Sequence, residues 1–153
     1  MKPLEIYIHI PFCVKKCNYC DFLSGPAPKE ECRAYVESLC RRIRSCGNLA
    51  KAYRVISIFV GGGTPSILEG EQMGQIFAAV RQAFFIEENA EITVEVNPGT
   101  VTEENLKMYR EAGVNRLSIG LQSASDEELK ILGRVHSFRD FLETYRMARE
   151  EGF

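Results

Sequence analysis

Long apolar runs and an excess of either charge are both missing from this sequence of 153 residues. No stretch is long and apolar enough to cross a bilayer, so no transmembrane segment is expected. The 19 basic and 21 acidic side chains give a formal net charge of −2, which does not favour a general binder of nucleic acid or of membrane surfaces. The apolar fraction of 45% and the charged fraction of 26% are ordinary for one globular domain with a core.

A secretion signal is missing as well. Nothing in the sequence resembles a secretory signal peptide, and the chain is not a small, loop-rich scaffold. The six cysteines are therefore not expected to form a disulfide framework. We expect the protein to work in the reducing cytoplasm.

Three of the cysteines lie close together near the N-terminus, at Cys13, Cys17 and Cys20. Their spacing is C-x3-C-x2-C, and they follow directly on an apolar strand pattern. Three thiolates this close can converge on one metal centre, and no fourth cysteine lies within reach. Structural zinc sites and ordinary electron-transfer clusters are usually closed by four ligands. A site with three ligands keeps one position open, which chemistry at a metal requires.

Other interpretations of these cysteines remain open at this point. Catalytic zinc usually recruits a histidine or a carboxylate, and His9 is the only nearby candidate. Unrelated free thiols are a third reading, but the spacing favours an iron–sulfur cluster. Lys15 and Lys16 favour thiolate over thiol, which suits either metal. The remaining cysteines, at 32, 40 and 46, fall in a predicted helix and are interpreted as packing or surface residues.

Strand and helix patterns alternate along the chain. The patterns predict strands over 4–10, 55–60, 91–96 and 115–119, and helices over 29–46, 71–85, 102–112, 125–133 and 137–151. Gly47 is expected to stop the first helix, and Thr102, Ser125 and Ser137 are expected to cap the last three. Four βα units of this kind predict an α/β fold with a parallel sheet and right-handed crossovers.

The unusual residues of the chain follow the ends of the predicted strands. Parallel strands present their carboxyl ends on one face, where active sites of α/β folds collect. Four motifs are therefore expected to meet there: the cysteines, Gly61-Gly62-Gly63-Thr64-Pro65, Glu95-Val96-Asn97-Pro98-Gly99 and Gln122-Ser123.

Taken singly, the last three motifs are weak signals. The glycine run permits a ligand to approach free peptide groups, but it is neither G-x-G-x-x-G nor a Walker loop, and a tight turn would also explain it. Glu95 could bind an ammonium or hydroxyl group, or be a solvated charge at a strand end. Gln122 could bond a sugar or a carboxylate. Arg134 could pair with a ligand carboxylate or lie on the surface, and His136 has no assigned role.

Taken together, these residues resemble the radical S-adenosylmethionine (SAM) superfamily. The three cysteines, the aromatic Tyr19 before the third of them and the Gly-Gly-Gly-Thr-Pro turn carry this resemblance. The run Tyr7-Ile8-His9-Ile10-Pro11-Phe12-Cys13 is similar to the oxygen-independent coproporphyrinogen oxidases and the related HemW-type heme chaperones, as are the motifs after the third and fourth strands. The resemblance covers nearly the whole chain.

The resemblance implies two cofactors. Cys13, Cys17 and Cys20 would hold three irons of a [4Fe–4S] cluster, and the amino and carboxylate groups of SAM would chelate the fourth. Electron transfer from the reduced cluster to the sulfonium would release a 5′-deoxyadenosyl radical. The positions that match SAM contacts in the family are Tyr7, Tyr19, Gly62, Gly63, Thr64, Glu95, Gln122 and Arg134.

One departure from the family bears on function. The coproporphyrinogen dehydrogenases carry a further cysteine two residues after the third ligand, where this chain has Phe22. The run Cys20-Asp21-Phe22 resembles that of the HemW-type proteins. This resemblance implies a heme chaperone, with heme as its ligand and a heme-receiving protein as its partner. A coproporphyrinogen III dehydrogenase acting on a porphyrinogen, or another radical SAM enzyme, is the alternative.

A second departure concerns length. The radical SAM core of the family has more βα units than the four found here, and a C-terminal domain follows it. The resemblance therefore implies a partial TIM-like barrel in which residues 1–153 are the N-terminal part of the core. The acidic residue for the SAM ribose and most of the substrate site would lie beyond this part.

Overall fold

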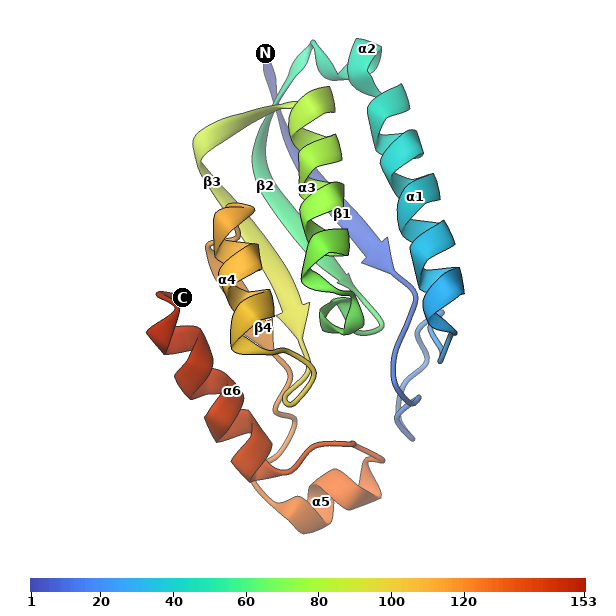
Figure 1. Ribbon diagram of the computed structural model, residues 1–153, viewed down its shortest axis with the longest axis vertical. Coiled ribbons are helices and arrows are strands. Elements are labelled where there is room, and N and C mark those ends of the chain that lie inside the picture. The colour runs from blue at the N-terminus through green and yellow to red at the C-terminus, as the bar shows by residue number, and fades with distance from the viewer.

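Four parallel strands form one sheet in the computed structural model, which describes residues 1–153 (Figure 1). The strands lie side by side in the order in which they occur in the chain. They are β1 (Lys2–Ile10), β2 (Tyr53–Gly62), β3 (Phe85–Val96) and β4 (Arg116–Ile119). Each neighbouring pair is parallel, so each connection must cross back over the sheet.

Helices make these crossovers and line up in front of the sheet in Figure 1. The row consists of α1 (Lys29–Ser45), α3 (Gly70–Ala83) and α4 (Glu103–Glu111), which lie in the three connections, and of α6 (Phe138–Glu150), which follows the last strand. Shorter pieces are α2 (Gly47–Ala50), the 3-10 turn η1 (Pro65–Ile67) and α5 (Asp126–Ile131), which lies beyond the carboxyl ends of the strands. The predicted α/β fold, an open and partial TIM-like barrel of βα units, is confirmed.

The two faces of the sheet differ in chemistry because successive side chains of a strand point to opposite faces. The face under the helices is apolar: Ile8, Val60 and Val94 are almost fully buried there and pack with α1, α3 and α4 in one core. The other face carries a row of residues paired across the sheet, namely Tyr7, Phe59, Thr93 and Arg116. This second, largely polar face corresponds to the interior of a barrel.

Two predicted boundaries were wrong. Gly47 does not simply stop the first helix, because α1 ends at Ser45 and Gly47 begins the short helix α2. The third strand begins at Phe85 instead of residue 91. Phe85 pairs with Arg54, and the register then slips between Val55 and Ser57, so the extra residues are taken up in an irregularity of the sheet.

The predicted helix caps were correct. The hydroxyl groups of Thr102, Ser125 and Ser137 each accept a backbone N–H from the first turn of α4, α5 and α6. At α5 the capping box is incomplete, because the Glu128 carboxylate accepts a hydrogen bond from the hydroxyl group of Ser123 instead. At Ser137 the box is complete, with Asp140 accepting from the Ser137 backbone.

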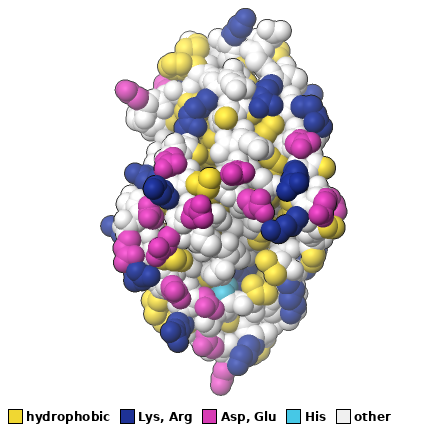
Figure 2. Space-filling view, viewed as in Figure 1, with side chains coloured by type: hydrophobic (Ala, Val, Ile, Leu, Met, Phe, Trp, Pro, Cys, Tyr) yellow, Lys and Arg dark blue, Asp and Glu magenta, His cyan; other side chains and the backbone are white.

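The surface over the helices carries both signs of charge. Figure 2 shows Lys and Arg side chains interspersed with Asp and Glu over this face. None of the helices has the length and hydropathy needed to cross a membrane.

Candidate functional site

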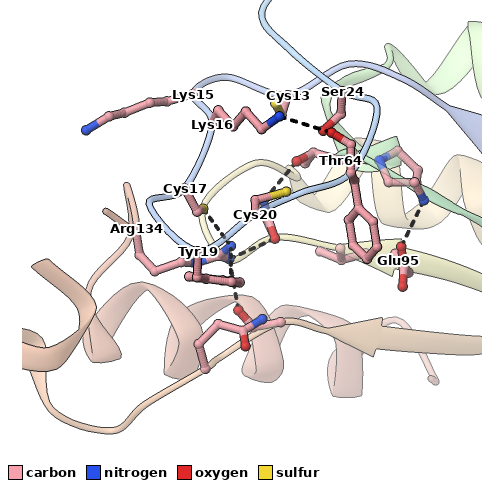
Figure 3. A pocket seen from close by; sticks show the side chains of 18 of the residues that line it. Cys13, Lys15, Lys16, Cys17, Tyr19, Cys20, Ser24, Thr64, Glu95 and Arg134 are labelled. Carbon is pink, nitrogen blue, oxygen red and sulfur yellow. Dashed lines mark hydrogen bonds between the residues drawn. The ribbon is translucent and has the colours of Figure 1, made fainter. Parts of the chain in front are cut away.

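A cavity of about 360 Å³ opens at the carboxyl ends of the strands. It is lined by the loops that follow β1, β2 and β3 and by the segment after β4, so the four motifs do meet (Figure 3). The predicted site residues that line it are Cys13, Cys17, Tyr19, Cys20, Gly62, Gly63, Thr64, Glu95, Gln122 and Arg134. Tyr7 is the one predicted site residue that does not line this cavity.

The cysteine loop is closed by backbone hydrogen bonds. The N–H of Cys13 donates to Gly25 O at 3.1 Å, and the N–H of Gly25 donates to Pro11 O at 3.1 Å. Inside the loop, the N–H of Cys20 donates to Cys17 O at 3.1 Å, which makes a tight turn between the last two cysteines. The loop therefore has a closed base and presents its thiols at defined places.

All three thiols of this loop are free and face the same cavity. Cys13 is buried, and Cys17 and Cys20 are half-buried. No three Cys, His, Asp or Glu side chains of the chain are close enough together to hold a single metal ion. Thiolates bound to three different irons of a cluster stand further apart than the ligands of one zinc ion. Three thiols on one loop that line one cavity are a donor set that fits an iron–sulfur cluster.

The other three cysteines take no part in the cavity. Cys32 and Cys40 are buried in the core on α1, which confirms their interpretation as packing residues. Cys46 lies half-buried at the end of α1, and its thiol is 3.4 Å from Arg42 O.

Glycines are required in the run after β2 because its backbone passes close to the backbone at the end of β1. A Cβ at Gly62, where φ is +120°, would lie 2.7 Å from Ile10 O, and one at Gly63 would lie 2.5 Å from Phe12 O. Gly63 N–H donates to Ile10 O at 2.8 Å and Thr64 N–H to Phe12 O at 2.6 Å. These N–H groups are therefore not free for a ligand, contrary to the expectation from the sequence. The run offers a side-chain-free wall.

Glu95 lies at the end of β3 and faces the glycine run. Its Oε2 accepts the N–H of Gly62 at 3.1 Å, so all three N–H groups after the first glycine are engaged. Burial raises the pKa of the Glu95 carboxyl above its ordinary value, although the Gly62 N–H and His9 act in the opposite direction. A half-buried carboxylate of this kind is prepared for a cationic partner in the cavity.

Tyr7 lies beside the cavity, on the polar face of the sheet. Its side chain is 59% exposed, its ring stacks on Phe59 with centroids 6.2 Å apart, and its hydroxyl is 3.1 Å from His9 Nδ1. The pKa of the Tyr7 hydroxyl is raised by burial and by the negative charge of Glu95. Tyr7 thus lies within electrostatic reach of Glu95.

Arg134 is the most highly connected side chain of the site. Its Nη2 donates to Asn97 Oδ1 at 2.8 Å and to Gly120 O at 3.1 Å. Its Nη1 lies 3.4 Å from Cys17 Sγ and 3.5 Å from Tyr19 Oη (Figure 3). The guanidinium therefore joins the cysteine loop to the ends of β3 and β4, and the alternative of a surface charge is excluded.

Asn97 is a residue of the site that sequence reasoning did not single out. Its Nδ2 donates to Thr64 Oγ1 at 2.9 Å while its Oδ1 accepts from Arg134. Its backbone N–H donates to Ser66 Oγ at 3.1 Å. The signal was present, because an Asn-Pro pair directly after a strand fixes the amide at the strand's end.

Asn18 ties the cysteine loop to α5. Its N–H donates to Leu132 O at 3.0 Å and its Nδ2 to Ile131 O at 2.8 Å, so it bonds carbonyl groups that the helix end leaves unpaired. Gly133 has φ of +74°, and a Cβ there would lie 2.8 Å from Asn18 Oδ1. The last turn of α5 is thereby held against the loop that carries Cys17 and Cys20.

Gln122 has an unusual backbone conformation. It is the one residue other than glycine with a positive φ, at 72°. Such a conformation is costly for a residue with a side chain, and it is common at ligand sites. The turn directs this residue to the cavity that it lines.

These features define a class of protein, and the comparison with known families agrees. Residues 7–153 match the family model of the radical SAM superfamily. The chain belongs to this superfamily, whose members use SAM together with a [4Fe–4S] cluster.

Individual relatives indicate to which group within the superfamily the chain is most similar. The chain is 46% identical over 140 residues to the heme chaperone HemW of Escherichia coli, covering 89% of this chain and 36% of that protein. It is 40% identical over 144 residues to the mitochondrial radical S-adenosyl methionine domain-containing protein 1 of Bos taurus, covering 94% of this chain and 33% of that protein. The resemblance to HemW-type proteins is confirmed.

A solved structure matches the fold closely. Coproporphyrinogen III oxidase (HemN) of Escherichia coli, described as a radical SAM enzyme, superimposes with a TM-score of 0.92 at 31% identity. The match covers 99% of this chain and 35% of that one. The chain thus spans little more than a third of the length of the proteins that it resembles.

Proposed function

We propose that this chain belongs to a HemW-type heme chaperone that binds a [4Fe–4S] cluster, SAM and heme. The observation that carries the proposal is the cavity in which three free thiols face Arg134, Glu95 and a wall of glycines. Its similarity to the heme chaperone HemW supplies the choice of heme. A protein that receives the heme would be its partner.

Different residues of the cavity would bind the cluster and SAM. Cys13, Cys17 and Cys20 would hold the cluster, which together with SAM supplies radical chemistry when bound. The Glu95 carboxylate would accept N–H bonds from the SAM ammonium group. Arg134, through Nη1, places a positive charge 3.4 Å from Cys17 Sγ.

The remaining predicted residues would shape the SAM site. Gly62 and Gly63 leave room for the ligand, and Thr64 is fixed by the Asn97 amide. The ring of Tyr19 lines the cavity, that of Tyr7 lies beside it, and Gln122 offers an amide from its strained turn. We expect these six positions, together with Glu95 and Arg134, to contribute to SAM affinity.

Phe22 decides between heme handling and decarboxylation in this proposal. It lines the rim of the cavity and is 66% exposed. The related dehydrogenases are expected to have a cysteine at this place, and an aromatic ring cannot supply a thiol. The structural likeness to the HemN enzyme keeps coproporphyrinogen III dehydrogenation as the second candidate.

We also propose that residues 1–153 form the N-terminal part of a larger barrel. The support is the open sheet, in which β1 and β4 are both edges, and the 36% of the length of the heme chaperone HemW of Escherichia coli that the chain covers. Six free cysteines suit a reducing compartment such as the cytoplasm.

The test is a comparison of heme binding with turnover in the anaerobically reconstituted protein. Heme titration should saturate, and SAM with coproporphyrinogen III should give no protoporphyrinogen IX. Cys17→Ser serves as the control that lacks a cluster ligand. Formation of protoporphyrinogen IX by the parent, absent in Cys17→Ser, would overturn the proposal in favour of the dehydrogenase.

A further inference from the structure

His136 is a buried imidazole next to the cavity that none of the roles above uses. It is only 6% exposed and lies between Arg134 and Ser137, the N-cap of α6. Its Nε2 is 3.1 Å from Leu121 O, and its Nδ1 is 3.4 Å from Arg134 Nη2. Both ring nitrogens thus have a partner in the segments that form the site.

The nature of these partners fixes the protonation of the ring. A carbonyl oxygen can only accept, so Nε2 must carry the proton that is donated to Leu121 O. A guanidinium can only donate, so Nδ1 must be unprotonated to accept from Arg134. The arrangement is consistent only with a neutral imidazole that has its proton on Nε2.

We infer that His136 is a positioning residue that holds Arg134 and the Leu121–Gln122 turn in place for SAM. This inference rests on the proposed function, because it assigns His136 to the same ligand site. His136 does not line the cavity, so it acts through these neighbours and not by touching the ligand.

The Leu121–Gln122 turn depends on the hydrogen bond from His136 Nε2 to Leu121 O. His136 is the one hydrogen-bond donor to Leu121 O in the structure. The next residue, Gln122, has φ of 72°, a conformation that persists only where its surroundings hold it. Loss of the imidazole would leave this carbonyl unpaired and let the turn relax away from the cavity.

Arg134 depends on the other ring nitrogen. Its Nη2 has two hydrogens and three acceptors, on Asn97, Gly120 and His136, while its buried Nε has no partner. Contacts on the Nη2 side determine where Nη1 lies, because the guanidinium is a rigid plane. His136 thereby helps to direct Nη1 toward Cys17.

The charges around His136 agree with a neutral ring. Burial lowers the pKa of His136, and the positive charge of Arg134 lowers it further. The hydrogen bond to Leu121 O and the carboxylates of Asp140 and Asp126 act in the opposite direction. The Asp140 carboxylate already accepts from the backbone and hydroxyl groups of Ser137.

The test measures SAM affinity by calorimetry in the reconstituted protein and in His136 variants. His136→Ala should weaken SAM binding about tenfold, the size expected for losing hydrogen bonds that position a charged group. His136→Gln, whose amide can donate toward Leu121 O, should restore part of this affinity. The matched control is Thr144→Val: the buried Thr144 lies on α6 outside the cavity, and its hydroxyl accepts the N–H of Gly99. Loss of this bond should leave SAM affinity unchanged.

Two further measurements separate positioning from a general loss of stability. His136→Ala should have a smaller effect on SAM affinity in an Arg134→Ala background than in the parent, because the part of its effect that passes through Arg134 is already lost. Nitrogen NMR should show a neutral ring with its proton on Nε2, and the chain has only two histidines to assign.

The outcomes are distinct. If the parent protein does not bind SAM, the proposed function fails and the inference fails with it. If the parent binds SAM but His136→Ala and His136→Gln both bind it equally well, only the inference fails. A fully additive effect with Arg134→Ala, or an Nδ1-protonated ring, would likewise overturn it.

Discussion

At the scale of single residues, Glu95 shows a conflict between stability and binding. Burial raises the pKa of this carboxyl, so the folded protein takes up a proton more readily than the unfolded chain. Between the ordinary value of 4.5 and the raised pKa, stability therefore falls as the pH rises. Above the raised pKa, the charged carboxylate is a cost to the ligand-free protein. The same charge is what would attract the SAM ammonium group.

Glu95→Gln should separate these two effects. Near neutral pH the variant should unfold about 2 °C higher than the parent, and the difference should disappear below about pH 4.5. SAM affinity should fall about tenfold, because a charge-assisted bond becomes a neutral one. Thermal unfolding at several pH values and SAM titration measure both quantities.

Glu91→Gln is the matched control on the same strand. Glu91 is exposed and pairs with Arg116 at 3.3 Å, away from the cavity, so its loss should leave SAM affinity unchanged. A Glu95→Gln protein that is less stable than the parent at neutral pH, with unaltered SAM affinity, would contradict this account of Glu95.

At the scale of elements, α5 and the cysteine loop form one unit. Asn18 supplies two donors to the carbonyl groups at the end of α5, and Gly133 permits the close approach. The same helix end leads directly into Arg134, whose N–H donates to Leu129 O at 2.9 Å. The contact of Asn18 with α5 therefore helps to set the distance between the thiols and the guanidinium.

Asn18→Ala should weaken this unit. We expect the variant to lose about 1 kcal/mol of unfolding free energy and to release iron faster on dialysis, because the loop is no longer tied to α5. Chemical denaturation and iron analysis would measure both effects. Asn48→Ala, at an exposed position of the short helix α2, is the control of the same residue type. Equal behaviour of the two variants would contradict the role given to Asn18.

The elements also show what the sequence could predict. Capping residues and hydrophobic periodicity are local, so the βα order and the caps at Thr102, Ser125 and Ser137 were predicted correctly. The start of β3 was not predicted, because it depends on a slip in the pairing with β2. That irregularity is a property of two strands together, and neither strand shows it alone.

The residues of the candidate site also fall into those that the sequence could predict and those that it could not. The cysteines and the glycine run stand out by composition, and strand ends predicted that they would meet. Asn18, Asn97 and His136 are ordinary residue types whose importance lies in partners distant in the sequence. The engagement of the glycine N–H groups by β1 also depends on a tertiary contact.

At the scale of the whole molecule, stability and chemistry occupy different parts of the fold. The apolar face of the sheet and the row of helices form the core, while the cavity lies at the carboxyl ends of the strands. The opposite face of the sheet is largely polar, and β1 and β4 are open edges. The site therefore rests on a rigid layer and is built from loops that this layer positions.

The central claim is that three cysteines hold a cluster with an iron left open for SAM. The most direct measurement is the electron paramagnetic resonance spectrum of the anaerobically reconstituted and reduced protein, recorded with and without SAM. Because an open iron changes its surroundings when a ligand binds, SAM should shift the cluster signal, and Cys17→Ser should show no such shift. A four-iron cluster signal that SAM leaves unchanged would contradict the account.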